Sequence, residues 1–112
     1  MTGYFTDSEI NGLQGVLVDR LYEARRVAGT PFIIDNGLRT VAENDHAHGV
    51  QDSAHLRGLA VDLACTDPSA RMLIVKGLLA AGFSRIGIYD RHIHADVDKT
   101  LPQNVMWWGV SH

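Results

Sequence analysis

The sequence predicts an α+β fold, with a small, mostly antiparallel sheet and flanking helices. Two segments have the three- and four-residue apolar spacing of helices, and four short segments are apolar or alternate as strands do. They follow one another as helix, strand, long polar segment, strand, helix and two strands. No repeat, low-complexity tract or linker divides them, so we expect residues 1–112 to form a single domain.

The first predicted helix begins at Thr6, which has the spacing of a capping box with Glu9. Gly12 and Gly15 weaken its middle, and Gly29 provides a stop because glycine readily adopts the left-handed conformation. The expected buried face comprises Ile10, Leu13, Leu17, Leu21, Ala24 and Val27.

The second predicted helix opens at Asp67, a capping residue, with Pro68 in the first turn, where its missing N–H costs nothing. Gly82 ends it. The expected buried face comprises Met72, Val75, Leu78 and Leu79.

Strands are predicted at residues 31–34, 59–64, 86–89 and 92–97. Residues 35–52 are polar without a sustained period, which indicates a long surface loop, and loops of this length in a small domain are usually functional. The tail, residues 101–109, is expected to pack on the body of the domain.

Composition excludes several classes of function. Ten basic and thirteen acidic residues give a net charge of −3, which offers no broad basic field for nucleic acid or a membrane surface. A single cysteine, Cys65, excludes an internal disulfide framework and is expected to be a small buried thiol. The longest apolar run, residues 72–75, cannot cross a bilayer, and the acidic Asp7 and Glu9 argue against a signal peptide. We therefore expect cytoplasmic synthesis, no membrane insertion and, by default, a monomer.

A first candidate motif runs from Ser53 to Asp62. It contains His55 in a loop, Gly58 at a tight turn and Asp62 within an apolar strand, whose neighbours predict that this carboxylate is buried. A buried carboxylate is costly unless it is paired or bound to a cation. A metal ion resolves that cost directly.

A second motif places Asp90, His92, His94 and Asp96 at alternate positions, so on a strand they share one face. A His-x-His pair alone is weak evidence for a metal, since it also occurs on ordinary strands. Combined with the first motif, it supplies two imidazoles and a carboxylate with an open position, as catalytic zinc sites do.

These residues resemble the signature of the D-alanyl-D-alanine metallopeptidase family, which includes bacterial D,D-carboxypeptidases and phage L-alanyl-D-glutamate endolysins. The similarity covers roughly residues 31–109. It rests on the first motif and His-x-His, with weaker matches at residues 37–40, 87–89 and 108–109. The resemblance implies a hedgehog/D,D-peptidase-like fold.

By this resemblance, His55, Asp62 and His94 would bind one Zn²⁺ ion. His92 would assist at the site without binding the metal. Arg39 would contact a carboxylate of the peptidoglycan stem peptide, since its fork of N–H donors suits that task, although a solvated loop arginine is the alternative. Ser53 would position substrate or hold the loop.

One departure from the family pattern concerns the general base. Many relatives carry an acidic residue three positions before the last zinc histidine, where this chain has Arg91. We therefore take Asp90 as the candidate base and His92 as the alternative. Asp96 is either an acceptor that fixes a ligand imidazole or only a surface strand residue.

Other polar and aromatic residues have ordinary interpretations. His46 and His48 fit a solvated loop better than substrate contact, and Trp107 and Trp108 fit packing better than a platform for stacking sugars.

The expected function is a zinc-dependent peptidase that hydrolyses bonds of peptidoglycan stem peptides, as a carboxypeptidase or an endopeptidase. Two settings fit. One is a phage lytic enzyme, released to the wall during lysis or carried on the virion, and the other is a bacterial enzyme acting on recycled peptides. The alternative function is a catalytically inactive, zinc-stabilised binding or virion structural domain.

Overall fold

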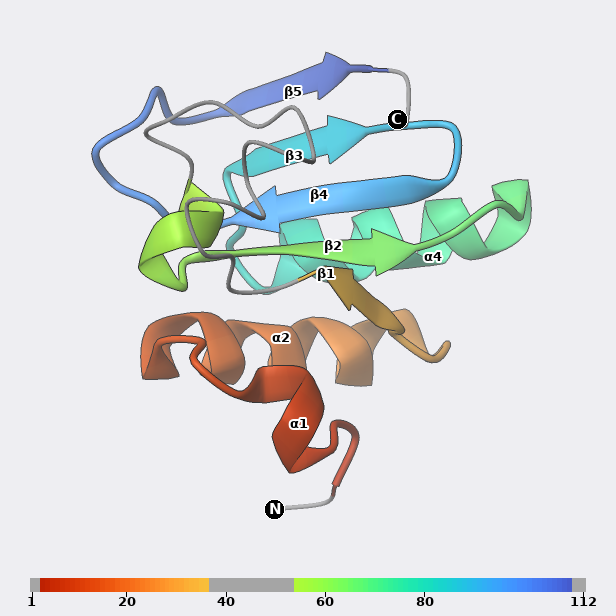
Figure 1. Ribbon diagram of the computed structural model, residues 1–112. Helices are drawn as coiled ribbons and strands as arrows, with labels where there is room; N and C mark the ends of the chain where they lie inside the picture. The colour runs from red at the N-terminus through yellow and green to blue at the C-terminus, as the bar shows by residue number, and fades with distance from the viewer. Residues whose placement is uncertain (1–2, 37–53, 110–112) are drawn as a thin grey trace.

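A five-stranded sheet forms the centre of the computed structural model, which describes residues 3–36 and 54–109. The strand order is β1-β2-β4-β3-β5 (Figure 1). Every neighbouring pair is antiparallel except β3 and β5, which run parallel. The predicted α+β class and mostly antiparallel sheet are confirmed. The strands are β1 (Ile34–Asn36), β2 (Ala60–Ala64), β3 (Arg85–Ile88), β4 (His92–Asp96) and β5 (Val105–Trp108).

Two helices, α2 (Gly15–Ala28) and α4 (Pro68–Ala80), pack against each other and supply one side of the core. Alternation along the strands places Val61, Leu63 and Ile93 in this core. Asp62 and His94 therefore project from the other face of the sheet. The fold thus separates an apolar face that stabilises the domain from a polar face that is available for chemistry.

The first predicted helix is divided into α1 (Asp7–Ile10) and α2, and the expectation of one continuous helix was wrong. The chain turns at Gly12, where φ is 81°. The ends were predicted correctly. Thr6 and Glu9 form both hydrogen bonds of the capping box, and Gly29 ends α2 in the left-handed conformation.

Helix α4 begins as predicted, because the Asp67 side chain accepts a hydrogen bond from the Ala70 backbone N–H. Its expected buried face was partly wrong, since Met72 is 73% exposed and Leu79 is 55% exposed. Leu78 is buried as predicted, and the other buried positions are Ile74 and Gly77. A Cβ on Gly77 would lie 2.3 Å from the Ala24 carbonyl oxygen. The missing side chain therefore lets α2 and α4 approach closely, with the Gly77 side of α4 facing α2.

The strand predictions differ in how well they match. Those at 59–64, 86–89 and 92–97 match β2, β3 and β4 within one residue at each end, whereas β1 begins three residues later than predicted. Strand β5 lies in the tail that was expected only to pack on the body. A short 3₁₀ helix, η1 (Ala54–Arg57), precedes β2.

Candidate metal centre

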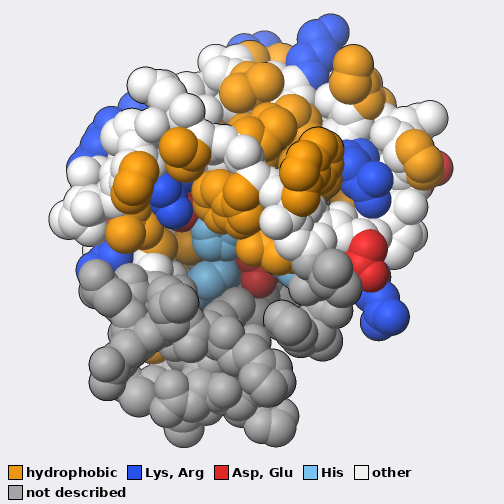
Figure 2. Space-filling view, turned by 90° about the horizontal axis from the view of Figure 1, so that it is seen from above, with side chains coloured by type: hydrophobic (Ala, Val, Ile, Leu, Met, Phe, Trp, Pro, Cys, Tyr) orange, Lys and Arg blue, Asp and Glu red, His pale blue; other side chains and the backbone are white. Residues whose placement is uncertain are grey.

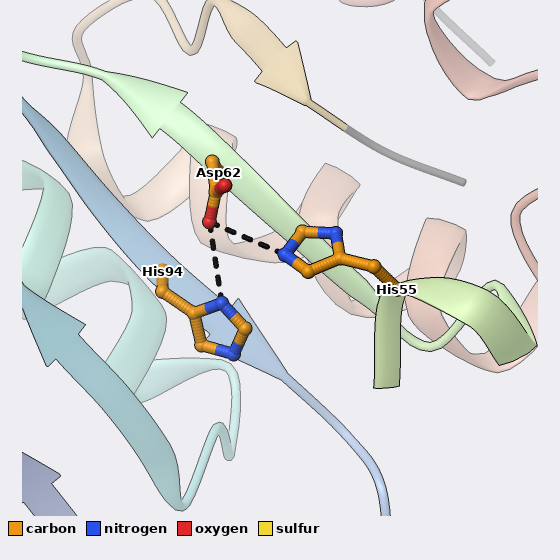
Figure 3. Close-up of side chains that lie close together, drawn as sticks. All are labelled: His55, Asp62 and His94. Carbon is orange, nitrogen blue, oxygen red and sulfur yellow. Dashed lines mark hydrogen bonds and ion pairs between the residues drawn. The ribbon is translucent and has the colours of Figure 1, made fainter. Parts of the chain in front are cut away.

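Three side chains from three elements converge on the polar face of the sheet. His55 comes from η1, Asp62 from β2 and His94 from β4 (Figure 3). Each offers one ligand atom, and these atoms all lie within 4.8 Å of one another. His55 and Asp62 are buried, and the His94 side chain is 14% exposed. Two imidazole nitrogens and a carboxylate oxygen in this arrangement suit a zinc ion with a position left for water.

Backbone geometry brings these residues together. Asp62 and His94 are direct partners across the antiparallel pair of β2 and β4, so their side chains point the same way from adjacent strands. Gly58 reverses the chain between η1 and β2 with φ of 70°, and a Cβ there would lie 2.5 Å from the Gly12 carbonyl oxygen. This tight turn allows His55 to reach back over β2.

The carboxylate of Asp62 is the electrostatic centre of the cluster. Its Oδ1 lies 3.4 Å from His55 Nε2 and 3.2 Å from His94 Nδ1. Burial would raise the pKa of Asp62, but interactions with the two histidines outweigh it and hold the pKa well below its usual range. Burial would lower the pKa of His94, but its hydrogen bonds with Asp62 and Asp96 raise that pKa overall. Asp62 is therefore ionised and ready to bind a cation near neutral pH.

Asp96 lies behind His94 and is 1% exposed, which resolves the two interpretations of this residue in favour of a buried acceptor. Its Oδ2 lies 2.7 Å from His94 Nε2, and Arg85 Nε donates to both carboxylate oxygens at 2.8 and 3.1 Å. Because a carboxylate paired with arginine accepts hydrogen bonds, Nε2 carries the proton and donates it. Nδ1, which faces Asp62, is then the nitrogen available to a metal.

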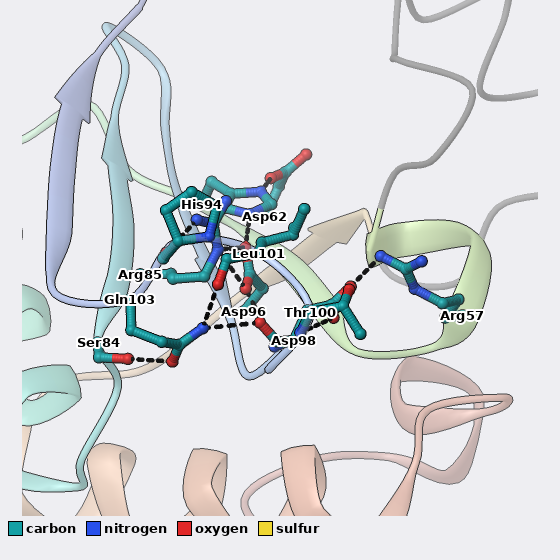
Figure 4. A network of polar contacts seen from close by, with 11 residues as sticks. Arg57, Asp62, Ser84, Arg85, His94, Asp96, Asp98, Thr100, Leu101 and Gln103 are labelled. Atoms are coloured by element: carbon teal, nitrogen blue, oxygen red, sulfur yellow. Dashed lines mark hydrogen bonds and ion pairs between the residues drawn. The ribbon is translucent and has the colours of Figure 1, made fainter.

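A second buried carboxylate, Asp98, connects this strand end to η1 (Figure 4). It forms an ion pair with Arg57, the last residue of η1, and accepts hydrogen bonds from the Thr100 backbone N–H and hydroxyl at 3.0 and 2.6 Å. Asp98 also donates its own backbone N–H to Asp96 at 3.2 Å. One polar network thus holds His94 directly and contacts η1, the short helix that carries His55.

Comparison with known proteins is consistent with this geometry. The model of the peptidase M15 family matches residues 3–98. The chain belongs to the peptidase M15 family. This match confirms the resemblance to the D-alanyl-D-alanine metallopeptidases, which are zinc-dependent. No curated protein matches the chain.

The M15 match ends before β5, so the last strand lies beyond the matched segment.

No helix in residues 3–36 and 54–109 is long and apolar enough to cross a membrane.

Of the two candidate bases, His92 lies next to the cluster. Its Nε2 is 3.8 Å from Asp62 Oδ1, and its side chain is 20% exposed. Burial lowers the pKa of His92, although the Asp62 carboxylate opposes that shift. Asp90 lies in the turn between β3 and β4 with its side chain 53% exposed, and one of its oxygens is 3.9 Å from Arg91 Nε. Asp90 is not among the three residues that converge.

The two predicted substrate-binding residues, Arg39 and Ser53, lie outside the described residues, as do His46 and His48. Five residues that contact the cluster or support it were not predicted from the sequence to belong to the site. One of them, Trp107, was expected only to pack. They are Arg57, Arg85, Tyr89, Asp98 and Trp107. A usable signal was Gly87, a glycine within a strand, which often marks the close approach of another group.

Proposed function

We propose that the chain is a zinc-dependent peptidase that hydrolyses peptide bonds of peptidoglycan stem peptides. The observation that carries this proposal is the convergence of His55, Asp62 and His94 in a member of the peptidase M15 family. Carboxypeptidase and endopeptidase action both fit this cluster. A phage lytic enzyme and a bacterial enzyme that acts on recycled peptides are both settings in which this activity would be used.

His55, Asp62 and His94 would hold one Zn²⁺ ion, which when bound would lower the pKa of a water molecule toward neutrality and polarise the scissile carbonyl. The donors fit this ion because two are imidazole nitrogens, one is an ionised carboxylate, and the set leaves a coordination position free.

His92 is the better placed of the two candidate bases. Its lowered pKa keeps the imidazole neutral near pH 7, so it can accept a proton from the attacking water. Its Nε2 lies beside Asp62, and the same nitrogen could then return the proton to the leaving amine. Asp90 could serve only from the exposed turn.

The substrate would be oriented by residues that precede η1. Arg39 would bind a carboxylate of the stem peptide through its paired N–H donors, and Ser53 would position the peptide or hold the loop. Both roles are proposals that follow from the family resemblance.

The test uses purified protein with its zinc content measured, incubated with defined muropeptides and analysed by mass spectrometry. His55→Ala and Asp62→Ala should abolish cleavage and reduce bound zinc. His92→Gln should retain zinc and lower kcat by about 10²- to 10⁴-fold, the usual contribution of a general base or acid. Asp90→Asn is measured alongside. Whichever of the two substitutions lowers kcat while zinc is retained identifies the residue that acts as the base.

One observation favours the second candidate function, an inactive zinc-stabilised domain. Arg91 occupies the position, three residues before His94, at which many relatives carry the acidic general base. The neighbouring Asp90 is exposed. Stoichiometric zinc without cleavage of any muropeptide would establish this alternative and refute the peptidase proposal.

A further inference from the structure

Two aromatic side chains reach the candidate metal centre from the side of β4 that lies away from β2. Tyr89 follows β3, and Trp107 belongs to β5. The Tyr89 ring stacks on the His92 ring, with centroids 4.3 Å apart and planes 12° from parallel. The Trp107 ring lies 5.4 Å from the His94 ring, and its Nε1–H donates to the Tyr89 hydroxyl at 2.9 Å. Trp107, Tyr89 and His92 therefore form a continuous series of contacts that ends beside Asp62. Hydrophobic side chains gather beside the histidines on this surface (Figure 2).

Two glycines provide the space for these rings. Gly87 pairs with His94 on one side and with Trp107 on the other, and a Cβ on Gly87 would lie 2.6 Å from the indole. A Cβ on Gly109 would lie 2.1 Å from the Tyr89 ring. Any larger residue at either position would have to displace an aromatic ring from the site.

The arrangement is more specific than apolar packing. Packing alone does not require the indole N–H to meet a phenol oxygen, nor a tyrosine ring to lie flat on an imidazole. The adjacent Trp108 faces the other side of the sheet, because neighbouring strand residues alternate, and it is 80% exposed. Arg85 lies over the Trp107 ring at 5.1 Å and also holds Asp96, so the indole is tied to the support of His94 as well.

We propose that Tyr89 and Trp107 are positioning residues that fix the His92 imidazole beside the metal centre. A partly exposed histidine has several accessible rotamers, and the stacked ring selects one of them. The indole N–H in turn holds the Tyr89 ring in place. Strand β5, beyond the family-matched segment, thereby contributes to the site. This inference rests on the proposed function for its effect on turnover, but the placement of His92 is independent of it.

The experiment compares the wild type with Tyr89→Leu, Tyr89→Phe and Trp107→Phe, with Trp108→Phe as the matched control. For each we would measure zinc content, kcat and KM on a muropeptide, and the ¹H–¹⁵N resonances of the His92 ring. Tyr89→Leu removes the stacked ring and should move the His92 resonances. It should lower kcat by about 10- to 100-fold, as misplacement of a catalytic group does, with KM and zinc content unchanged.

Tyr89→Phe keeps the stacked ring but loses the hydroxyl that accepts the indole N–H, so it should retain more kcat than Tyr89→Leu and move the His92 resonances less. Trp107→Phe removes the N–H donor and should move the resonances in the direction of Tyr89→Leu, whereas Trp108→Phe should change nothing. Unchanged His92 resonances in Tyr89→Leu would overturn the proposal. If the wild type cleaves no muropeptide, the proposed function fails, and the resonances alone decide whether Tyr89 positions His92.

Discussion

Asp96 uses both of its carboxylate oxygens, one shared between His94 and Arg85 and the other between Arg85 and the Asp98 backbone N–H. This saturation leaves the carboxylate with one orientation, and the orientation fixes which nitrogen of His94 faces Asp62. A carboxylate behind a ligand histidine also raises the basicity of that ligand. Asp96 thus affects metal binding without contributing a ligand atom.

Asp96→Asn should weaken zinc affinity by about 10- to 100-fold, the usual cost of losing such a partner, because the amide holds the imidazole less strongly. The measurement is competition for zinc against a chromophoric chelator. Asp19→Asn, a substitution of an exposed aspartate on α2, is the control and should leave affinity unchanged. Equal affinities in all three proteins would show that Asp96 serves folding alone.

Asp98→Asn should destabilise the protein in a pH-dependent way. Burial would raise the pKa of Asp98, but hydrogen bonds from Thr100 and the ion pair with Arg57 outweigh it and lower the pKa. A lowered pKa contributes stability above the unfolded value of about 3.9 and loses it as pH falls through the folded value.

We therefore expect Asp98→Asn to lower the free energy of unfolding by about 1–3 kcal/mol at pH 7, with a smaller difference at pH 3. Urea denaturation of the metal-free proteins at both pH values provides the comparison. A loss of the same size at both pH values would mean that the charge of Asp98 is not what stabilises the fold.

At the scale of elements, the contact between α2 and α4 depends on one missing side chain. A Cβ on Gly77 would lie 2.3 Å from the Ala24 carbonyl oxygen and 2.8 Å from the Ala28 Cβ, and neither the backbone nor a methyl group can rotate away.

Gly77→Ala should therefore destabilise the protein by about 1–3 kcal/mol, as overpacking does, although alanine normally favours a helix interior. Gly15→Ala is the matched control, because a Cβ there meets nothing within 4 Å. Thermal unfolding of both variants decides the matter, and a stabilised Gly77→Ala would show that the two helices can separate at little cost.

An element could be predicted from the sequence when residues close together in the chain determine it, and could not when it depends on pairing with a distant segment. The two helix caps, strand β2 and the β3–β4 pair were predictable because short-range patterns specify them. Strand β5 was not predicted, because its four apolar residues show no alternation and its place in the sheet depends on parallel pairing with β3. The division of the first helix at Gly12 was signalled by glycine, but the apolar spacing on either side suggested continuity.

The candidate site shows the same division. Alternation along the second motif predicted that His94 shares a face with its polar neighbours, whereas the choice of Asp62 and His94 as partners came from the family resemblance. Their direct pairing across β2 and β4 is shown by the fold. The contribution of Tyr89 and Trp107 depends on which strand lies beside β3 and on the space above Gly87. Neither fact is present in any one segment of the chain, so neither could be read before the fold was known.

At the scale of the whole molecule, the three candidate ligands come from η1, β2 and β4, so a bound ion would link all three elements. Binding to the folded state alone stabilises a protein by about 2.7 kcal/mol when the free ion is at 100 times its Kd.

Removal of zinc with a chelator should accordingly lower Tm, and restoring zinc should recover it. Differential scanning calorimetry of the wild type and His55→Ala measures the effect. The variant should show little response to zinc. A wild-type Tm that is insensitive to both treatments would argue against a site formed by these residues.

The pairing of Asp62 with His94 across β2 and β4 also bears on how the chain tolerates insertions and deletions. One residue added within either strand would move every following side chain to the opposite face, and a ligand would then enter the apolar core beside Val61 or Ile93. Residues outside the strands are not subject to this alternation between faces. The seven-position interval from His55 to Asp62 is also expected to keep its length, because the tight turn at Gly58 that packs on Gly12 determines where His55 lies. The interval from Asp62 to His94 can change in length at the exposed residues that precede α4.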